Sequence, residues 1–153
     1  MKYYKYRFSK YDPAYKDENG CYLKADWTSI CDIGRAFDGV NLTVEVFYSV
    51  LQRYVEVISF LMKQCGVSVM IVSQLEKYTE DCMWKEGDEV DFETALVICK
   101  FMLEEKLWCH LYSRKTHFVL SCEYDFYLHV ICRELNEFEL SRIGEYGLFT
   151  EVL

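Results

Sequence analysis

The sequence predicts one α+β domain in which an antiparallel or mixed β-sheet carries two long helices on one face. Three observations indicate this fold class. The 153 residues match the length of a single domain, two segments repeat apolar residues at helical spacing, and the last third of the chain holds several strand-like segments in succession. The length predicts a single domain over residues 1–153. Strands that follow one another without an intervening helix favour an antiparallel or mixed sheet.

The first third of the chain predicts a strand, an irregular region and a long helix. Residues 2–8 alternate between two faces, as a strand does. Residues 11–39 show turn signals and little periodicity, so this region either contains short strands and turns or serves a function. The helix is expected over residues 44–65, because Thr43 is a suitable N-cap and Gly66 a suitable end.

The middle of the chain predicts a buried strand, an acidic loop and a second helix. Residues 67–72 form a β-branched run that is typical of a buried strand, and residues 75–90 are polar and acidic. Asp91 is placed to cap a helix over residues 92–106, whose apolar positions recur at helical spacing.

Three strands and a short helix are expected in the last third. The strands cover residues 107–113, 116–122 and 124–132, and a short hairpin connection joins the first two. Residues 136–145 resemble a helix that stops near a glycine, and residues 148–153 are either a terminal strand or a tail.

Composition and charge narrow the class of partner. Hydrophobic residues make up 52% of the chain and there is one proline, which excludes a disordered or linker-rich protein. The net charge of -8 argues against binding to nucleic acid or to an anionic membrane, because phosphate groups would be repelled. The N-terminus has no apolar signal-peptide region and no segment is apolar enough to cross a membrane, so a cytoplasmic protein is expected.

The eight cysteines predict neither a disulfide framework nor a metal site. They are spread through the chain without a CxxC pair, and in a cytoplasmic protein we expect them to be reduced, small, buried residues. Cys109 and His110 are the only adjacent pair of Cys and His, but on a strand their side chains point to opposite faces. No metal and no cofactor are therefore expected.

Catalytic patterns are weak in this sequence. It contains no GxSxG, HExxH, P-loop or GxGxxG motif. Asp125 and His129 share one face of a predicted strand, but four residues of strand place them about 13 Å apart. A carboxylate pair stays open, because acidic residues are numerous. We expect a protein that is not an enzyme, and the alternative is a small hydrolase or nucleotide-modifying enzyme that uses His129 with Asp125 or a carboxylate pair.

One acidic segment is the main candidate for binding a protein partner. Residues 80–93 include seven acidic residues and one lysine. Such a surface suits a basic partner, because charge speeds association and a buried ring supplies affinity. The alternative is a solvated loop with a well-capped helix start. The residues expected to bind the partner are Tyr78, Glu80, Asp81, Trp84, Glu86, Asp88, Glu89, Asp91 and Glu93. A second candidate surface in the irregular region consists of Tyr15, Asp17, Glu18 and Trp27.

Three segments of the chain resemble a known family. They are Tyr11–Gly34, Leu107–Cys109 and Glu123–Tyr127. They are similar to the YDPxYRDExGxYxxDEWTSxSDIG block and the WCxL and YDYYxY elements of a family of small bacterial proteins that is common in Firmicutes. The chain departs from this pattern at Ala25 and Cys31. The resemblance implies a different specificity for this chain if those two positions touch a partner.

Proteins of this family resemble immunity proteins encoded beside polymorphic or contact-dependent toxins. The resemblance therefore implies a non-enzymatic protein that binds the C-terminal domain of a cognate toxin and occludes its active site or a surface beside it. It names neither the toxin nor a contact residue. Nuclease toxin domains are basic because they hold a phosphate backbone, which suits an acidic partner. An acidic adaptor protein is the remaining alternative.

Overall fold

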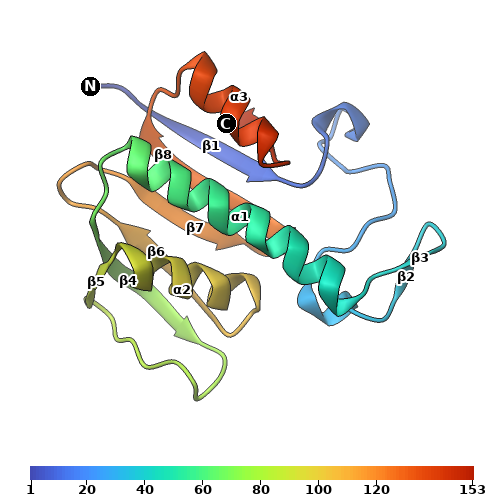
Figure 1. The fold of residues 1–153 in the computed structure, drawn as a ribbon, viewed down its shortest axis with the longest axis horizontal. Coiled ribbons are helices and arrows are strands. Elements are labelled where there is room, and N and C mark those ends of the chain that lie inside the picture. The colour runs from blue at the N-terminus through green and yellow to red at the C-terminus, as the bar shows by residue number, and fades with distance from the viewer.

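A seven-stranded antiparallel β-sheet forms one layer of the fold, in the order β5-β4-β6-β7-β8-β1-β9 (Figure 1). The computed structural model describes all residues from 1 to 153. The predicted α+β class is confirmed, and the named strands all pair antiparallel. The strands of this sheet are β1 (Tyr3–Ser9), β4 (Val69–Lys77), β5 (Glu89–Asp91), β6 (Leu107–Tyr112), β7 (Val119–Glu123), β8 (Tyr127–Arg133) and β9 (Phe149–Val152).

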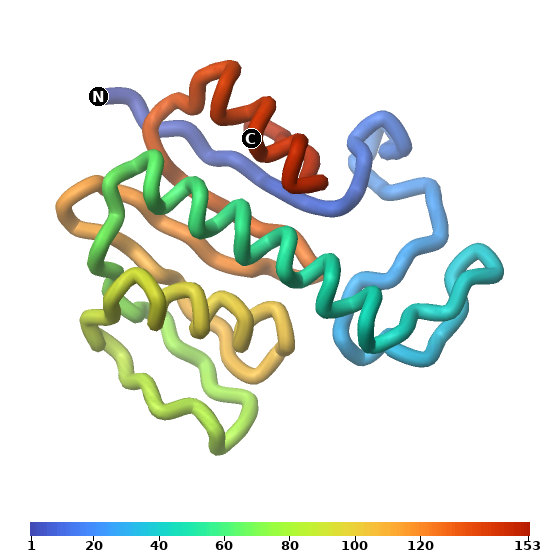
Figure 2. The backbone as a smooth tube through the Cα atoms, viewed as in Figure 1, coloured from blue at the N-terminus to red at the C-terminus, as the bar shows by residue number.

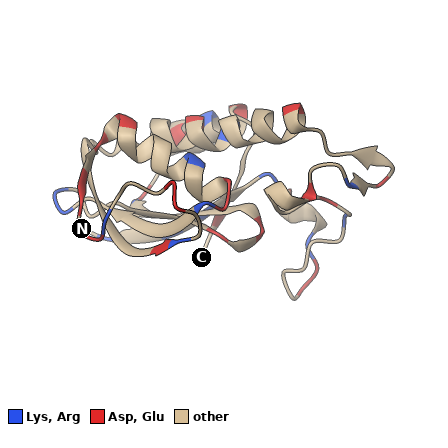
Figure 3. Ribbon diagram, turned by 90° about the horizontal axis from the view of Figure 1, so that it is seen from below, with Lys and Arg blue, Asp and Glu red and all other residues tan.

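Three helices lie on one face of the sheet and form the second layer (Figures 1 and 3). They are α1 (Val44–Gln64), α2 (Phe92–Leu103) and α3 (Glu137–Glu145). Each begins after a side chain that accepts a backbone N–H group: Thr43 for α1, Asp91 for α2 and Asn136 for α3. The sequence predicts two helices on this face, and α3 is the third because its Ile143 is buried in the common core. None of the helices combines the length and the apolar character that crossing a bilayer requires.

A core of 37 buried residues lies between the helices and the sheet. It includes an aromatic cluster in which Phe47 and Tyr54 of α1 pack against Phe126, and the Trp27 ring packs against both Phe47 and Phe126. Phe47 and Tyr54 have no solvent exposure. The irregular region is therefore anchored in the same core as the regular elements, through Trp27.

β4 is longer than the sequence predicts. It runs to Lys77, five residues past the expected end, because a bulge at Gln74 (φ +52°) lets the pairing with β6 continue. The Glu86 carboxylate accepts the backbone N–H groups of Gln74 and Leu75, each at 2.9 Å, and so satisfies the groups that the bulge leaves unpaired. Part of the predicted acidic loop is therefore strand.

Three other boundaries differ from prediction where the backbone is left-handed. The strand expected over residues 116–122 begins only at Val119, just after His117, which has φ +55°. The strand expected over residues 124–132 begins only at Tyr127, because residues 124–126 form a 3₁₀ turn. The second helix ends at Leu103, ahead of the expected residue 106, and Glu105 just beyond it has φ +58°, which an α-helix does not accommodate.

The irregular region between β1 and α1 projects from one end of the sheet (Figure 2). It contains short strands and turns, which is one of the two alternatives that the sequence predicts for this region. These are 3₁₀ turns at Pro13–Tyr15 and Ile30–Asp32, and a hairpin of β2 (Ala36–Phe37) and β3 (Val40–Asn41). The hydroxyl of Tyr11 lies 3.0 Å from the carbonyl oxygen of Trp27, which fastens the start of this region to its middle.

The structure contains no disulfide, and five cysteines are buried: Cys82, Cys99, Cys109, Cys122 and Cys132. Cys21 and Cys31 are exposed, so the expectation of buried cysteines is wrong for these two. Both lie in the irregular region, which has few buried positions to offer.

Candidate partner-binding site

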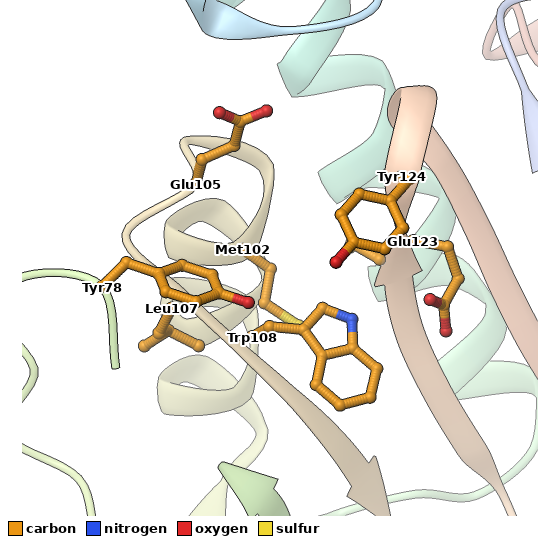
Figure 4. Close-up of a pocket in the computed structure, with 8 residues that line it drawn as sticks. Tyr78, Met102, Glu105, Leu107, Trp108, Glu123 and Tyr124 are labelled. Atoms are coloured by element: carbon orange, nitrogen blue, oxygen red, sulfur yellow. The ribbon is translucent and has the colours of Figure 1, made fainter. Parts of the chain in front are cut away.

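A pocket of about 420 Å³ opens at the end of the sheet where β4 and β7 finish and β6 begins (Figure 4). Small-ligand sites typically measure ~300–1,000 Å³, so this pocket has room for a side chain of a partner. Its lining residues are Tyr78, Met102, Glu105, Leu107, Trp108, Cys122, Glu123 and Tyr124.

Strand pairing brings the pocket residues together from distant parts of the chain. Lys77 at the end of β4 pairs with Leu107 at the start of β6, and the backbone N–H of Tyr78 donates to the carbonyl oxygen of Lys106 at 3.1 Å. β7 pairs with the other side of β6 and places Glu123 at the same end of the sheet. The sheet therefore fixes the spacing of the pocket walls.

The pocket has an apolar floor and aromatic walls. The floor consists of three buried residues, Met102, Leu107 and Cys122. The rings of Tyr78 and Tyr124 stand on opposite sides of the cavity, with the Trp108 indole between them (Figure 4). Tyr78 is 53% exposed and Tyr124 is 88% exposed. Rings this exposed contribute little to the core, so both are available to a partner.

Carboxylates form the rim of the pocket. Glu105 accepts a hydrogen bond from the Ser29 hydroxyl at 2.8 Å, and Glu123 accepts one from the Ser121 hydroxyl at 2.6 Å. In Figure 4 the two carboxylates lie at different edges of the cavity and point away from its centre. Each hydroxyl occupies one of several acceptor positions on its carboxylate, so both groups can accept further donors.

The hydroxyl of Tyr78 holds a third carboxylate, that of Glu76, next to the pocket. It donates to Glu76 at 2.7 Å, and that hydrogen bond is the main reason why the pKa of Tyr78 is raised to about 12. Desolvation contributes less, and the charges of Glu76, Tyr124 and Glu105 contribute less again. The phenol is therefore neutral at physiological pH, and the charge at the rim is negative.

The turn that carries Tyr124 has a strained backbone. Asp125 and Phe126 have φ values of +63° and +64°, a region that costs non-glycine residues ~1–3 kcal/mol each. The Tyr54 hydroxyl donates to the carbonyl oxygen of Phe126 at 2.7 Å, and the Tyr11 hydroxyl lies 2.8 Å from the carbonyl oxygen of Asp125. These bonds and the burial of the Phe126 ring hold Tyr124 in its exposed position.

The three segments that carry the sequence resemblance meet at this end of the sheet. Leu107–Cys109 supplies Leu107 to the floor of the pocket and the Trp108 indole above it, and Glu123–Tyr127 supplies the Tyr124 wall and the Glu123 carboxylate of the rim. Tyr11–Gly34 reaches the rim through Ser29, whose hydroxyl donates to Glu105 although 76 positions separate the two residues.

Two aromatic residues that the sequence suggests as partner contacts are buried. Trp84 is 8% exposed, because the loop after β4 folds back on α2 and places the indole edge-on against Phe101 at 5.3 Å. Trp27 is 6% exposed within the aromatic core. Neither ring is therefore exposed in the free protein, where both pack in the core, and their binding to a partner stays a prediction.

Three acidic residues of the predicted binding segment have structural roles. Glu86 supports the β4 bulge, Asp88 accepts the backbone N–H of Lys85, and Asp91 caps α2. The other members of the segment are exposed: Tyr78, Glu80, Asp81, Glu89 and Glu93. Their binding to a partner stays a prediction.

The second candidate surface lies in the irregular region, apart from the acidic segment (Figure 1). Tyr15 is 43% exposed, and the Lys24 ammonium lies 3.4 Å from the centre of its ring. The Asp17 carboxylate accepts two backbone N–H groups and shapes a turn, while Glu18 is exposed. The fold does not merge the two predicted surfaces, and Tyr78 is the only predicted contact that lines the pocket.

The structure does not assemble the alternative catalytic pair. Asp125 is exposed in the turn before β8, whereas His129 lies within β8. Burial is the main cause that lowers the pKa of His129, and Asp125 is not among the charged groups that shift it, which are Lys5, Glu123, Arg7 and Glu151. No group of three or more His, Cys, Asp or Glu side chains is placed to hold a metal ion.

The sequence pattern does not single out four of the pocket residues: Glu105, Trp108, Glu123 and Tyr124. A signal for three of them is present, because they belong to segments that carry the resemblance. Glu105 has no such signal, since only the folded chain brings the end of α2 beside Ser29.

Comparisons of the chain with protein-family models, curated proteins and solved structures gave no match. The chemistry of the site follows from its own residues. An apolar floor, three aromatic rings and an acidic rim suit a cationic group far better than an anionic one.

Proposed function

We propose that this protein is a non-enzymatic immunity protein that binds a basic domain of a cognate bacterial toxin at the pocket end of its sheet. Binding there occludes the toxin's active site or a surface beside it. The proposal rests on one observation above all. The three segments that resemble the immunity-like family meet at a single acidic, aromatic pocket.

The charge of the chain supports a basic partner. The net charge is -8, and exposed acidic residues continue from the pocket into the segment after Tyr78, at Glu80 and Asp81. Opposite charges raise association rates above the ordinary ~10⁵–10⁶ M⁻¹s⁻¹, while exposed rings supply the affinity once the surfaces meet. An immunity protein needs both, because the toxin must be captured quickly and held.

Co-expression tests this proposal. Cells that produce the toxin domain encoded beside the gene are grown with and without this protein, and survival is counted. We expect protection by the native protein and weaker protection by the double variant Tyr78→Ala/Tyr124→Ala, since both rings are largely exposed and neither supports the core. The matched control is Phe138→Ala/Phe149→Ala, which removes two exposed rings away from the pocket.

Two results would contradict these expectations. Equal killing with and without the protein contradicts the immunity proposal. Equal protection by the pocket variant and the native protein places the toxin on another surface.

A further inference from the structure

We infer that the pocket between Tyr78, Trp108 and Tyr124 receives the side chain of a single arginine of the partner. The inference deepens the proposed function, on which it rests for the source of the arginine. The observations that carry it are the rings and carboxylates that the chain leaves without a cation of its own.

The pocket rings lack the cations that other rings of the chain have. Nine pairs of a lysine or arginine with an aromatic ring occur in the structure, at distances from 3.4 Å to 5.7 Å. None of them involves Tyr78, Trp108 or Tyr124. Tyr78 and Tyr124 are largely exposed, so the negative faces of these two rings are open to a cation from outside, whereas Trp108 is half-buried and packs edge-on with His110 at 5.0 Å.

The rim carboxylates are also without cations. Seven ion pairs occur in the chain, and none includes Glu76, Glu105 or Glu123. Lys106 is adjacent in sequence to Glu105, but its ammonium lies over the Phe101 ring at 4.8 Å and 4.0 Å from Glu104. The negative charge at the rim is therefore not compensated within the chain.

The shape of the pocket favours arginine over lysine. A guanidinium is planar, stacks on aromatic faces and carries five N–H donors, whereas an ammonium is a compact and strongly hydrated charge. The two tyrosine rings stand on opposite sides of the cavity, and carboxylates lie at its edges (Figure 4). The methylene groups of an arginine lie on the apolar floor of Met102 and Leu107 while its head reaches the rim.

A small arginine probe tests the inference without the toxin. N-acetyl-arginine amide is titrated into the protein, and the indole N–H signal of Trp108 is followed by NMR. Trp27 and Trp84 are buried, so their signals serve as internal controls. We expect a saturable shift of the Trp108 signal with millimolar affinity, a weaker response to N-acetyl-lysine amide, and none to N-acetyl-citrulline amide, which has the same shape without the charge.

Variants locate the response. Tyr124→Leu is expected to weaken arginine binding about two- to fivefold, the effect of one exposed cation–π contact. Its matched control is Phe138→Leu, another exposed ring, which is expected to leave the binding unchanged. Glu123→Gln is expected to weaken binding as well, because it removes a rim charge and keeps the side-chain shape.

Two results overturn the inference: an equal response to citrulline amide, or an arginine response that Tyr124→Leu and Glu123→Gln leave unchanged. Failure here is distinguishable from failure of the proposed function. Protection from the toxin without arginine binding retains the immunity proposal and overturns the pocket's occupant. Arginine binding without protection retains arginine as the pocket's occupant and overturns the immunity proposal.

Discussion

The hydroxyl of Tyr54 joins three parts of the molecule: α1, the turn before β8 and the segment after β1. It donates to the carbonyl oxygen of Phe126 in the strained turn at 2.7 Å and accepts the backbone N–H of Lys10, just after β1, at 2.9 Å. Tyr54 itself has no solvent exposure, so water has no access to its hydroxyl. Tyr54→Phe removes this hydroxyl and keeps the ring, which packs against Phe126 at 4.7 Å.

The expected cost follows from these two bonds. A buried group that loses its partner costs about 1–3 kcal/mol, and here one donor and one acceptor lose theirs, so Tyr54→Phe is expected to lower the free energy of unfolding by about 3 kcal/mol. Tyr48→Phe on the same helix is the control. Its hydroxyl donates to Glu104 at the surface, where water replaces the bond, and the expected loss is about 0.5 kcal/mol or less.

Urea unfolding followed by tryptophan fluorescence measures both losses. Trp27 is a suitable probe of this region, because its ring packs edge-on against Phe126 at 5.0 Å. Linear extrapolation of each transition gives the free energy in water. Similar losses in Tyr54→Phe and Tyr48→Phe would refute the reasoning, since the buried hydroxyl would then carry no more stability than an exposed one.

Three further predictions concern the core, the thiols and the charges. Trp84→Ala is expected to destabilise the free protein by about 3–5 kcal/mol in urea unfolding, because the ring is buried, and a variant as stable as the native protein would place Trp84 outside the core. Burial raises the pKa of Cys109 to about 12, so its contribution to stability is present below pH ~9 and is lost as the pH rises towards 12. Between pH 9 and 11 the free energy of unfolding should therefore fall less steeply with pH for Cys109→Ala than for the native protein. Equal slopes for the two proteins would contradict a raised pKa of Cys109. Glu80→Gln/Asp81→Asn is expected to slow association with the toxin domain and flatten its salt dependence more than the charge-matched Glu56→Gln/Glu134→Gln, as measured by stopped-flow kinetics. Equal effects of the two pairs would mean that only net charge matters.

Elements marked by caps and periodicity could be predicted closely from the sequence. The helix expected over residues 44–65 is found at Val44–Gln64, because Thr43 caps it and Gly66, with φ +67°, ends it. The helix at Glu137–Glu145 has a capping box of Asn136 and Glu139, a signal that local sequence carries.

The pocket could not be predicted in the same way, because it depends on long-range pairing. Nothing local indicates that β4 passes its predicted end, and the support that Glu86 gives to the bulge exists only after the loop folds back. The turn at residues 124–126 has no glycine, and its alternating aromatic residues favour a continuous strand. Burial of the Phe126 ring and its hydrogen-bonded carbonyl group outweigh that local preference.

Hydrogen exchange of the protein, alone and saturated with the toxin domain, tests most directly that the pocket end of the sheet is the binding surface. We expect backbone exchange to slow at residues 78–81 and 122–125 in the complex. We expect no change in α3, which does not line the pocket. Protection confined to α3 or to the irregular region, with the pocket segments unchanged, would contradict this.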